Sequence, residues 1–385
     1  MFMESVKQRN PKLIQASIEL HQSGSILPDT YVLDLDTIKE NAIKIAEEAE
    51  KNQIELFFML KQIGRNPAVA KMLIEAGIKH AVVVDFKEAQ VMMDNNIPLG
   101  NVGHLVQVPE SLLKKIMVYG SKYMTVYTVE KLQSINAIAK ELGIKQKVLL
   151  RIVDEEDELY PGQYGGFTID ELPSLMCHFK KLENIEIAGI TSFPCFLYDS
   201  KEGYLKPTHN VETVHEAKKM LEREGFPIKE LNMPSATSVY TLPFLKEIGG
   251  TQGEPGHALT GTTPMHANED LAETPAMLYV SEVSHNFKEK AYVYGGGFYR
   301  RGHLENVLID QNGKQIESRI NPLADENIDY YLEADMTLPV GATAIMAFRT
   351  QVFVTRSEVA LVSGIQDGAP KLEGIYDSQG KYLRG

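Results

Sequence analysis

The chain has 385 residues, of which 43% are hydrophobic and 24% charged, a composition typical of a folded protein with a sizeable core. Its 39 basic and 52 acidic residues give a formal net charge of −13, which disfavours binding to nucleic acid or to an anionic membrane surface. Two cysteines, Cys177 and Cys195, are too few for a disulfide framework, and no Cys/His cluster has zinc-ligand spacing. We therefore expect a cytoplasmic protein without a signal peptide or a membrane span.

From about residue 54 to residue 256, short apolar runs alternate with stretches of helical period. Eight runs can be distinguished, and they begin near Ile54, Ala81, Val102, Met124, Lys147, Ile185, Glu230 and Gly250. Near-continuous apolar strands that alternate with helices are typical of a parallel sheet covered on both faces. Eight such units predict an α/β fold of the (β/α)8 TIM barrel type. An open doubly wound sheet is the alternative, but no G-x-G-x-x-G motif follows the first run.

After about residue 266, predicted strands follow one another without intervening helices. They are Met277–His285, Lys290–Phe298, Leu304–Ile309, Lys314–Ile320, Ala342–Thr355 and Glu358–Ser363. We therefore expect an N-terminal extension (1–28), a barrel (29–265, with a strand and a helix over 29–53 leading into it) and a C-terminal all-β domain (266–385). The strand Tyr31–Asp36 could instead pair with the β domain, and Asp36 or Thr37 is expected to cap the helix after it.

Lys61 ends the first apolar run, directly after five apolar residues. Active sites of such barrels lie at the carboxyl ends of the strands. Partial desolvation at this position favours the neutral amine, which is the form that acts as a nucleophile in Schiff-base chemistry. The alternative is a solvent-exposed lysine at a strand end, the more common case for lysine in general.

The ends of runs seven and eight are suited to binding an anion. Run seven ends in the hydroxyl-rich segment Pro234–Ser238, and run eight ends in Gly253–His257, where glycines let backbone N–H groups approach a phosphate. Each segment alone more often forms a helix cap or a turn. Combined with the amine of Lys61 and the carboxylate of Glu254, however, they supply the three groups that pyridoxal phosphate requires.

The sequence resembles the alanine-racemase-like, fold type III pyridoxal-phosphate proteins, and most closely their YhfX-like branch. The resemblance runs from about residue 28 to the end. It rests on PDTYVLDLDTIKENA, FFMLKQIGRNP, AGITSF, MPSAT, EPGHALTG and YVYGGGF, which begin at Pro28, Phe57, Ala188, Met233, Glu254 and Tyr292. It implies pyridoxal 5'-phosphate as cofactor, an amino acid as small-molecule substrate and a homodimer.

Carried over position by position, the resemblance implies that Lys61 forms the Schiff base and that Glu254 faces the pyridine nitrogen. Ser235 and the backbone N–H groups of Gly256 and His257 would hold the phosphate.

Four further residues are candidates. Tyr294 resembles the tyrosine that, in the racemases, reaches the site from a second subunit as the other acid/base; alternatively, it is an ordinary strand tyrosine. Arg151 near the end of run five could bind the cofactor or form a structural ion pair. Ser192 stands where the racemases usually have a histidine beside the ring. Thr237 belongs to the hydroxyl-rich segment that would bind the cofactor.

Two other polar features favour structural interpretations. His104 in run three is more often a satisfied polar residue than a base. The acidic run Asp154–Glu158 is more often a solvated loop than a site for a cationic side chain.

The resemblance implies a pyridoxal-phosphate-dependent amino-acid racemase, an isomerase that abstracts the Cα proton from an external aldimine. A decarboxylase of the same fold is an alternative, since Glu254 replaces the arginine common in alanine racemases. It is disfavoured because His257 replaces the arginine of the decarboxylase EPGR motif and no cysteine follows Cys195. A non-catalytic cofactor carrier is a third possibility, which a full β domain disfavours.

Overall fold

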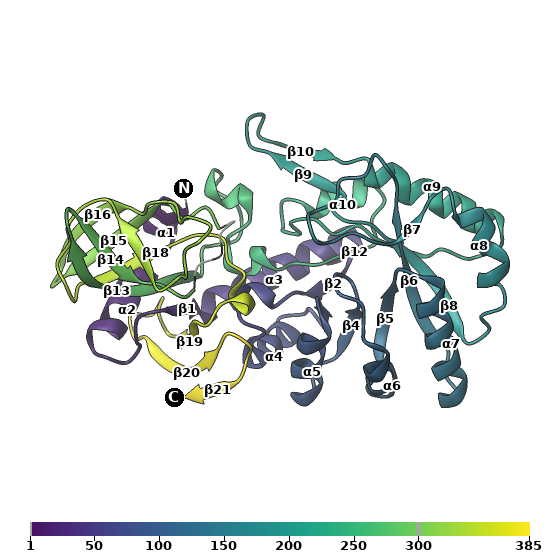
Figure 1. Cartoon of the computed structure of the whole chain (residues 1–385), viewed down its shortest axis with the longest axis horizontal. Coiled ribbons are helices and arrows are strands. Elements are labelled where there is room, and N and C mark those ends of the chain that lie inside the picture. Colours follow the sequence, from purple (N-terminus) through teal and green to yellow (C-terminus); the bar gives the residue numbers. More distant parts are fainter. Residues whose placement is uncertain (1, 298, 300–301) are drawn as a thin grey trace. The chain divides into compact units, whose positions relative to one another are not determined.

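The computed structural model describes residues 2–297, 299 and 302–385 (Figure 1). The chain divides into two compact units, and each unit is assembled from separate segments. A β-rich unit comprises Met1–Ile43, Leu60–Val69 and His257–Gly385, and a barrel unit comprises Lys44–Met59 and Ala70–Gly256. The domain bounds expected from sequence, which follow the order of the chain, remain predictions. In the described part of the chain, no helix combines the length and apolar character needed to cross a membrane.

Eight parallel strands close into a ring in the barrel unit. In order around the ring they are β2 (Glu55–Phe58), β3 (His80–Val83), β4 (Leu99–Val102), β5 (Ser121–Val126), β6 (Gln146–Val153), β8 (Ile185–Thr191), β11 (Glu230–Asn232) and β12 (Gln252–Gly253). β5 pairs with β6, and β12 pairs with β2, which closes the barrel. The predicted (β/α)8 TIM barrel is confirmed, and each of the eight apolar runs lies on or beside one of its strands.

Helices connect these strands and lie outside the ring (Figure 1). They are α5 (Phe86–Asp94), α6 (Glu110–Tyr119), α7 (Val129–Leu142), α8 (Leu172–Phe179), α9 (Asn210–Arg223) and α10 (Leu242–Glu247). Two more, α3 (Leu35–Asn52) and α4 (Pro67–Glu75), have residues in both units. A short strand, β7 (Phe167–Thr168), pairs with β6, and β9 (Phe196–Asp199) forms a hairpin with β10 (Tyr204–Pro207).

Alternate residues of the strands fill the interior of the barrel, as the period of two along a strand requires. The buried cluster consists of Phe57, Met59, Val82, Val84, Tyr123, Leu149 and Ala188. Phe57 is fully buried, and its ring meets that of Tyr123 edge-on at a centroid distance of 6.1 Å. Gly100 on β4 makes room for this ring, because a Cβ atom there would lie 2.3 Å from Cδ1 of Phe57.

Substitution of Gly100 by alanine is therefore expected to destabilise the barrel by about 2 kcal/mol, since overpacking displaces the ring of Phe57. We expect Phe57→Leu to relieve part of this effect in a double-mutant cycle of urea unfolding, because the smaller side chain vacates the contested volume. Purely additive free energies for the two substitutions would contradict the contact.

The β-rich unit is built on one sheet in the order β16, β15, β18, β13, β1, β19, β20, β21. These strands span Lys314–Arg319, Asn306–Gln311, Thr343–Met346, Met277–Phe287, Thr30–Asp34, Glu358–Ser363, Lys371–Asp377 and Tyr382–Arg384. Beside this path, β14 (Lys290–Tyr294) pairs with β13 and β17 (Tyr331–Ala334). The predicted C-terminal β-rich region is confirmed, although Phe298 at the end of one predicted strand lies outside the described residues.

The N-terminal strand β1 lies inside this sheet, between β13 and β19. The suggestion that it pairs with the β domain is thus confirmed. The following helix α3 begins at Leu35, and the carboxylate of Asp34 accepts a hydrogen bond of 3.2 Å from the N–H of Thr37. The predicted cap, Asp36 or Thr37, is therefore wrong, because the strand runs directly into the helix and its last residue caps it.

Two helices that were not predicted precede β1. They are α1 (Phe2–Arg9) and α2 (Pro11–Gln22), whose apolar faces join β1, β13, β18 and β19 in one buried cluster. The described part of this unit also contains four short 3₁₀ helices: η1 (Lys61–Ile63), η2 (His257–Thr260), η3 (Pro264–Ala267) and η4 (Val352–Val354). The prediction of one long strand over residues 342–355 is only partly correct. Residues Thr343–Met346 form β18, whereas Val352–Val354 form η4.

Asp29, just before β1, is a largely buried carboxylate with 18% of its side chain exposed. It accepts hydrogen bonds from Tyr279 (2.9 Å) and from the hydroxyl of Ser357. Burial raises its pKa from 3.8 to about 6, and the two hydrogen bonds and Arg356 oppose this shift. The folded state therefore favours the protonated, neutral carboxyl group. The contribution of this group to the free energy of unfolding is largest below pH 3.8 and is lost as the pH rises through about 6.

We expect Asp29→Asn to remove this dependence and to raise stability above pH 7 by up to roughly 3 kcal/mol, the free energy of about two pKa units. Asparagine can still accept both hydrogen bonds and tolerates the positive φ of 66° at this position. Melting temperatures between pH 4 and pH 8 test this, with Asp367→Asn, at an exposed position, as control. An unchanged pH profile in Asp29→Asn would contradict the assignment.

Candidate active site

The carboxyl ends of the barrel strands gather several polar side chains, and Glu254 lies at their centre. It follows β12 directly, and its side chain is 1% exposed. The amide of Asn232, the last residue of β11, donates to Oε1 at 3.0 Å. Nε2 of His104 lies 3.5 Å from Oε2, and the backbone N–H of Glu254 donates to the hydroxyl of Thr237 at 3.0 Å. The carboxylate is thus buried and held by its neighbours.

Asn232 joins three strand ends and was not predicted as a site residue. Besides Glu254, its amide donates to Gln252 on β12 at 3.2 Å, and its Oδ1 accepts from Thr191 on β8 at 2.7 Å. Its sequence signal is weak, because it is one of two polar residues in the short strand Glu230–Asn232. That signal does not reveal its partners, which come from other strands.

Arg151 on β6 is buried and has no carboxylate partner among the described residues. It donates to the hydroxyl of Tyr127 at 2.9 Å and to the carbonyl of Gln163 at 2.7 Å, and its guanidinium lies over the Tyr127 ring. Tyr127 in turn donates to the carbonyl of His104 at 2.6 Å. Burial raises the pKa of Tyr127, and the charge of Arg151 opposes this. The alternative of a structural ion pair therefore finds no support.

The predicted serines lie at two neighbouring strand ends. The Ser235 hydroxyl accepts hydrogen bonds from the backbone N–H groups of Cys195 (3.0 Å) and Phe196 (3.2 Å), which leaves its own proton available to donate. Ser192 follows β8, and its hydroxyl accepts from the amide of Asn210 at 3.0 Å. Burial raises the pKa of the Cys195 thiol, consistent with a packing role.

Lys61 and His257 belong to the β-rich unit and begin the short helices η1 and η2. Each follows a barrel strand closely in the chain. The carbonyl of Gln62 accepts from the Thr350 hydroxyl at 2.7 Å, which fixes the turn that carries Lys61. Burial lowers the pKa of His257 well below its usual value, and the positive charges of Arg349 and Lys61 lower it further. Its imidazole is therefore neutral at pH 7.

Gly256 and His257 present backbone N–H groups at the start of η2. Within the described part of the chain, no carbonyl or side chain accepts from either group. Two adjacent unsatisfied N–H groups at a helix start are suited to bind an anion.

Tyr294 is the last residue of β14 in the β-rich unit. It is 37% exposed, and its ring contacts that of Tyr331 at a centroid distance of 5.8 Å. The hydroxyl of Ser281 donates to its carbonyl at 2.7 Å, which anchors the backbone and leaves the phenol at the surface. Within its own chain, the structure places Tyr294 in a group of surface aromatic residues.

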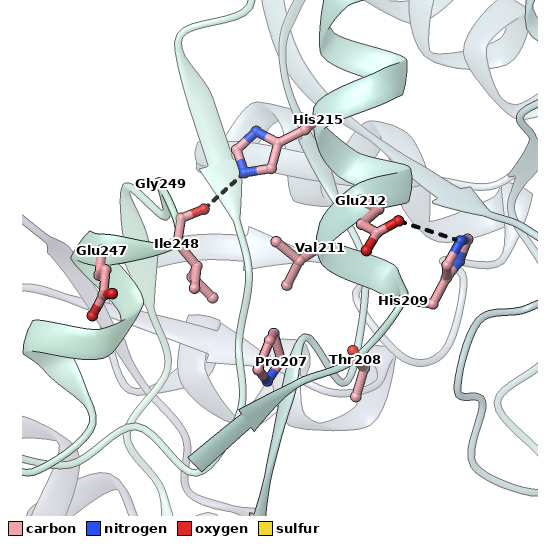
Figure 2. A pocket seen from close by; sticks show the side chains of 9 residues that line it. All are labelled: Pro207, Thr208, His209, Val211, Glu212, His215, Glu247, Ile248 and Gly249. Atoms are coloured by element: carbon pink, nitrogen blue, oxygen red, sulfur yellow. Dashed lines mark hydrogen bonds and ion pairs between the residues drawn. The ribbon is translucent and has the colours of Figure 1, made fainter.

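A separate cavity of about 450 Å³ opens between the start of α9 and the end of α10 (Figure 2). None of the predicted site residues lines it. His215 at its wall lies 2.8 Å from the carbonyl of Ile248. His209, also in its wall, is bonded to the buried carboxylate of Asp157 at 3.0 Å, which raises the pKa of His209. Asp157, in the acidic run, therefore serves to fix a loop rather than to face solvent.

Residues 33–264 match the family model described as alanine racemase, N-terminal domain. The chain belongs to the alanine racemase family. Residues 278–372 match a second model, YhfX-like, C-terminal domain. The Escherichia coli (strain K12) protein described as uncharacterized protein YhfX is 43% identical over 385 residues, and the match covers all of both chains. The resemblance to alanine-racemase-like proteins and to their YhfX-like branch is thereby confirmed.

Proteins whose solved structures share this fold are named for different reactions. Alanine racemase of Clostridium difficile 630, in complex with cycloserine, is 20% identical with a TM-score of 0.64 and covers 91% of this chain and 99% of its own. D-threonine aldolase from Filomicrobium marinum is 16% identical with a TM-score of 0.67, covering 92% and 95%. Diaminopimelate decarboxylase from Helicobacter pylori, complexed with L-lysine, is 14% identical with a TM-score of 0.64, covering 93% and 94%. The fold is therefore shared, and the site must decide the reaction.

Proposed function

We propose that this chain is a pyridoxal-phosphate-dependent racemase of an amino acid, acting by removal and return of the Cα proton. The observation that carries the proposal is the buried carboxylate of Glu254, fixed by Asn232 at the mouth of a barrel of this family. When bound, pyridoxal phosphate supplies an electron sink for the charge that develops at Cα, and a carboxylate at the ring nitrogen strengthens that sink.

The donor set fits such a cofactor. The hydroxyl of Ser235 has a proton to donate, and the N–H groups of Gly256 and His257 have no acceptor among the described residues. These three groups would hold the phosphate. The buried guanidinium of Arg151 would face a ring oxygen or a substrate carboxylate, and its Nε has no hydrogen-bond partner in the described part of the chain. Thr237 would act through the backbone of Glu254, to which its hydroxyl is bonded, and Ser192 would lie beside the ring.

Lys61 and Tyr294 would carry the proton on the two faces of the substrate. The amine of Lys61 would bind the cofactor at rest and accept the proton from one face. The phenol of Tyr294, exposed on β14, would act on the other face of the substrate bound to a second copy of the chain. The working form would therefore be a homodimer, which we place in the cytoplasm. The 37% exposure of Tyr294 supports this role, because the group is accessible to a partner.

A decarboxylase is the second candidate, and Glu254 favours it, since a carboxylate rather than an arginine would face the ring. His257 argues against it, because a neutral imidazole adds no charge where the decarboxylase motif has an arginine. A carrier without catalysis would leave Tyr294 without a role.

The test is to load the purified chain with pyridoxal phosphate and to incubate it with individual L- and D-amino acids in deuterated water. A racemase exchanges the Cα proton and forms both enantiomers, which NMR and chiral chromatography detect. Release of carbon dioxide with an amine product would identify a decarboxylase, and release of glycine with an aldehyde from a β-hydroxy amino acid would identify an aldolase. A loaded protein that exchanges no Cα proton would contradict the proposal.

A further inference from the structure

The Glu254 carboxylate is held from two sides of the barrel mouth. Asn232, which donates to Oε1 at 3.0 Å, comes from β11, the strand next to β12. His104, whose Nε2 lies 3.5 Å from Oε2, follows β4, three strands away in the other direction around the ring. The contact between His104 and Glu254 therefore crosses the mouth, whereas the contact with Asn232 follows the sheet.

Both members of the crossing pair are deeply buried. The side chains of His104 and Glu254 are 2% and 1% exposed. The ring of Phe193 packs edge-on against His104 at a centroid distance of 6.0 Å. A carboxylate withdrawn from water to this degree is costly unless donors or opposite charge surround it, and the imidazole of His104 and the amide of Asn232 provide them.

The backbone of His104 is itself fixed. The hydroxyl of Tyr127 donates to its carbonyl at 2.6 Å, and that same hydroxyl accepts from Arg151 at 2.9 Å. His104 thus links the carboxylate proposed to face the ring nitrogen to the guanidinium proposed to face a ring oxygen or a substrate carboxylate.

We propose that His104 is a positioning residue that holds the Glu254 carboxylate, in its charged form, toward the ring nitrogen of a pyridine cofactor. The proposal rests on the proposed function and adds to it. The amide of Asn232 donates to Oε1 at 3.0 Å, and Nε2 of His104 faces Oε2 at 3.5 Å, so the two residues constrain the carboxylate from two sides. In this role His104 acts through Glu254.

The test compares His104→Leu, which removes the donor, with His104→Gln, which keeps an N–H donor on a side chain of similar length. Each variant is loaded with pyridoxal phosphate labelled with ¹⁵N in the ring, and the ¹⁵N chemical shift reports whether that nitrogen is protonated. We expect a protonated signal in the wild type and in His104→Gln. In His104→Leu the signal should move toward the unprotonated value, as in Glu254→Gln, and cofactor affinity should fall about tenfold.

A second readout needs no cofactor. In the unloaded protein, His104→Leu should lower the melting temperature by about 5 °C or more, and the same substitution in a Glu254→Gln background should lower it clearly less. A protonated ring nitrogen in folded His104→Leu, or equal losses in both backgrounds, would overturn the role of His104. Failure of the wild type to bind pyridoxal phosphate is a separate outcome, which overturns the proposed function and the role toward the ring together.

Discussion

Replacing Lys61 with alanine is expected to remove the covalent attachment of pyridoxal phosphate and to lower the rate of Cα proton exchange by at least about 10³-fold. Lys61 is the only lysine in η1 (Lys61–Ile63), and the hydroxyl of Thr350 anchors this turn by donating to the carbonyl of Gln62. Borohydride reduction of the loaded wild type, followed by proteolysis and mass spectrometry, should find the phosphopyridoxyl group on the peptide that contains Lys61. The absorbance band of the bound cofactor near the visible edge should disappear on reduction and be absent from the variant.

Lys71→Ala is the matched control, because Lys71 is an exposed lysine on the nearby helix α4. It should keep the absorbance band and the modified peptide. The assignment of Lys61 fails if the label is found on another lysine, or if Lys61→Ala retains a band that borohydride removes.

Glu254→Gln is expected to lower the exchange rate by about 10²–10³-fold, since it removes a charge placed where the transition state requires it. The side chain keeps its size, and its oxygen can still accept from Asn232, so the fold should survive. The cofactor should still bind, with a changed absorbance spectrum, because the phosphate donors are intact. Exchange rates and spectra of the loaded variant measure both effects.

Glu230→Gln provides the comparison for this variant. Glu230 is a partly buried acid at the opposite, amino-terminal end of β11, where it accepts from Thr251 at 2.9 Å. Its replacement should affect stability but not the spectrum of the bound cofactor. An exchange rate that is the same in wild type and Glu254→Gln would remove Glu254 from the proposed site.

The barrel could be predicted because buried parallel strands consist largely of consecutive apolar residues, which are visible in the sequence. The third run shows where this reasoning loses accuracy. It was placed from Val102 onward, whereas β4 spans Leu99–Val102. Gly100 and Asn101 break the apolar pattern, and only the tertiary structure explains them. Gly100 makes room for Phe57, and Asn101 accepts a hydrogen bond of 2.8 Å from Thr125 on the neighbouring strand β5.

In the described part of the β-rich unit, the strands that were not predicted are β17, β20 and β21. β17 and β21 have only four and three residues, and Glu373 and Gly374 interrupt β20, so none of them forms a long apolar or alternating run. The residues at positions 2–22 were missed for a different reason. Their apolar side chains are covered by strands far away in the sequence, so local periodicity alone did not distinguish two helices from an extension.

The residues of the candidate site also differ in how far the sequence could predict them. Glu254, Ser235 and Arg151 could be proposed because each lies close to the carboxyl end of a strand, and these strand ends form the mouth of a barrel. His104 was considered, but its partner could not be found, because it lies 150 positions further along the chain, on a strand whose place around the ring only the closed barrel determines. Asn232 had no partner in sequence for the same reason.

The division of the chain into interleaved units has a consequence for its synthesis. On the ribosome, residues 44–256 emerge before the strand at Met277 that β1 needs as a neighbour, and β19 emerges later still. The barrel unit can therefore fold while both edges of β1 are still unpaired. More than half of the chain must be synthesised after β1 before its first partner, β13, is available. Truncation before β19 should leave β1 paired with β13 alone, with its other edge open to association with other chains.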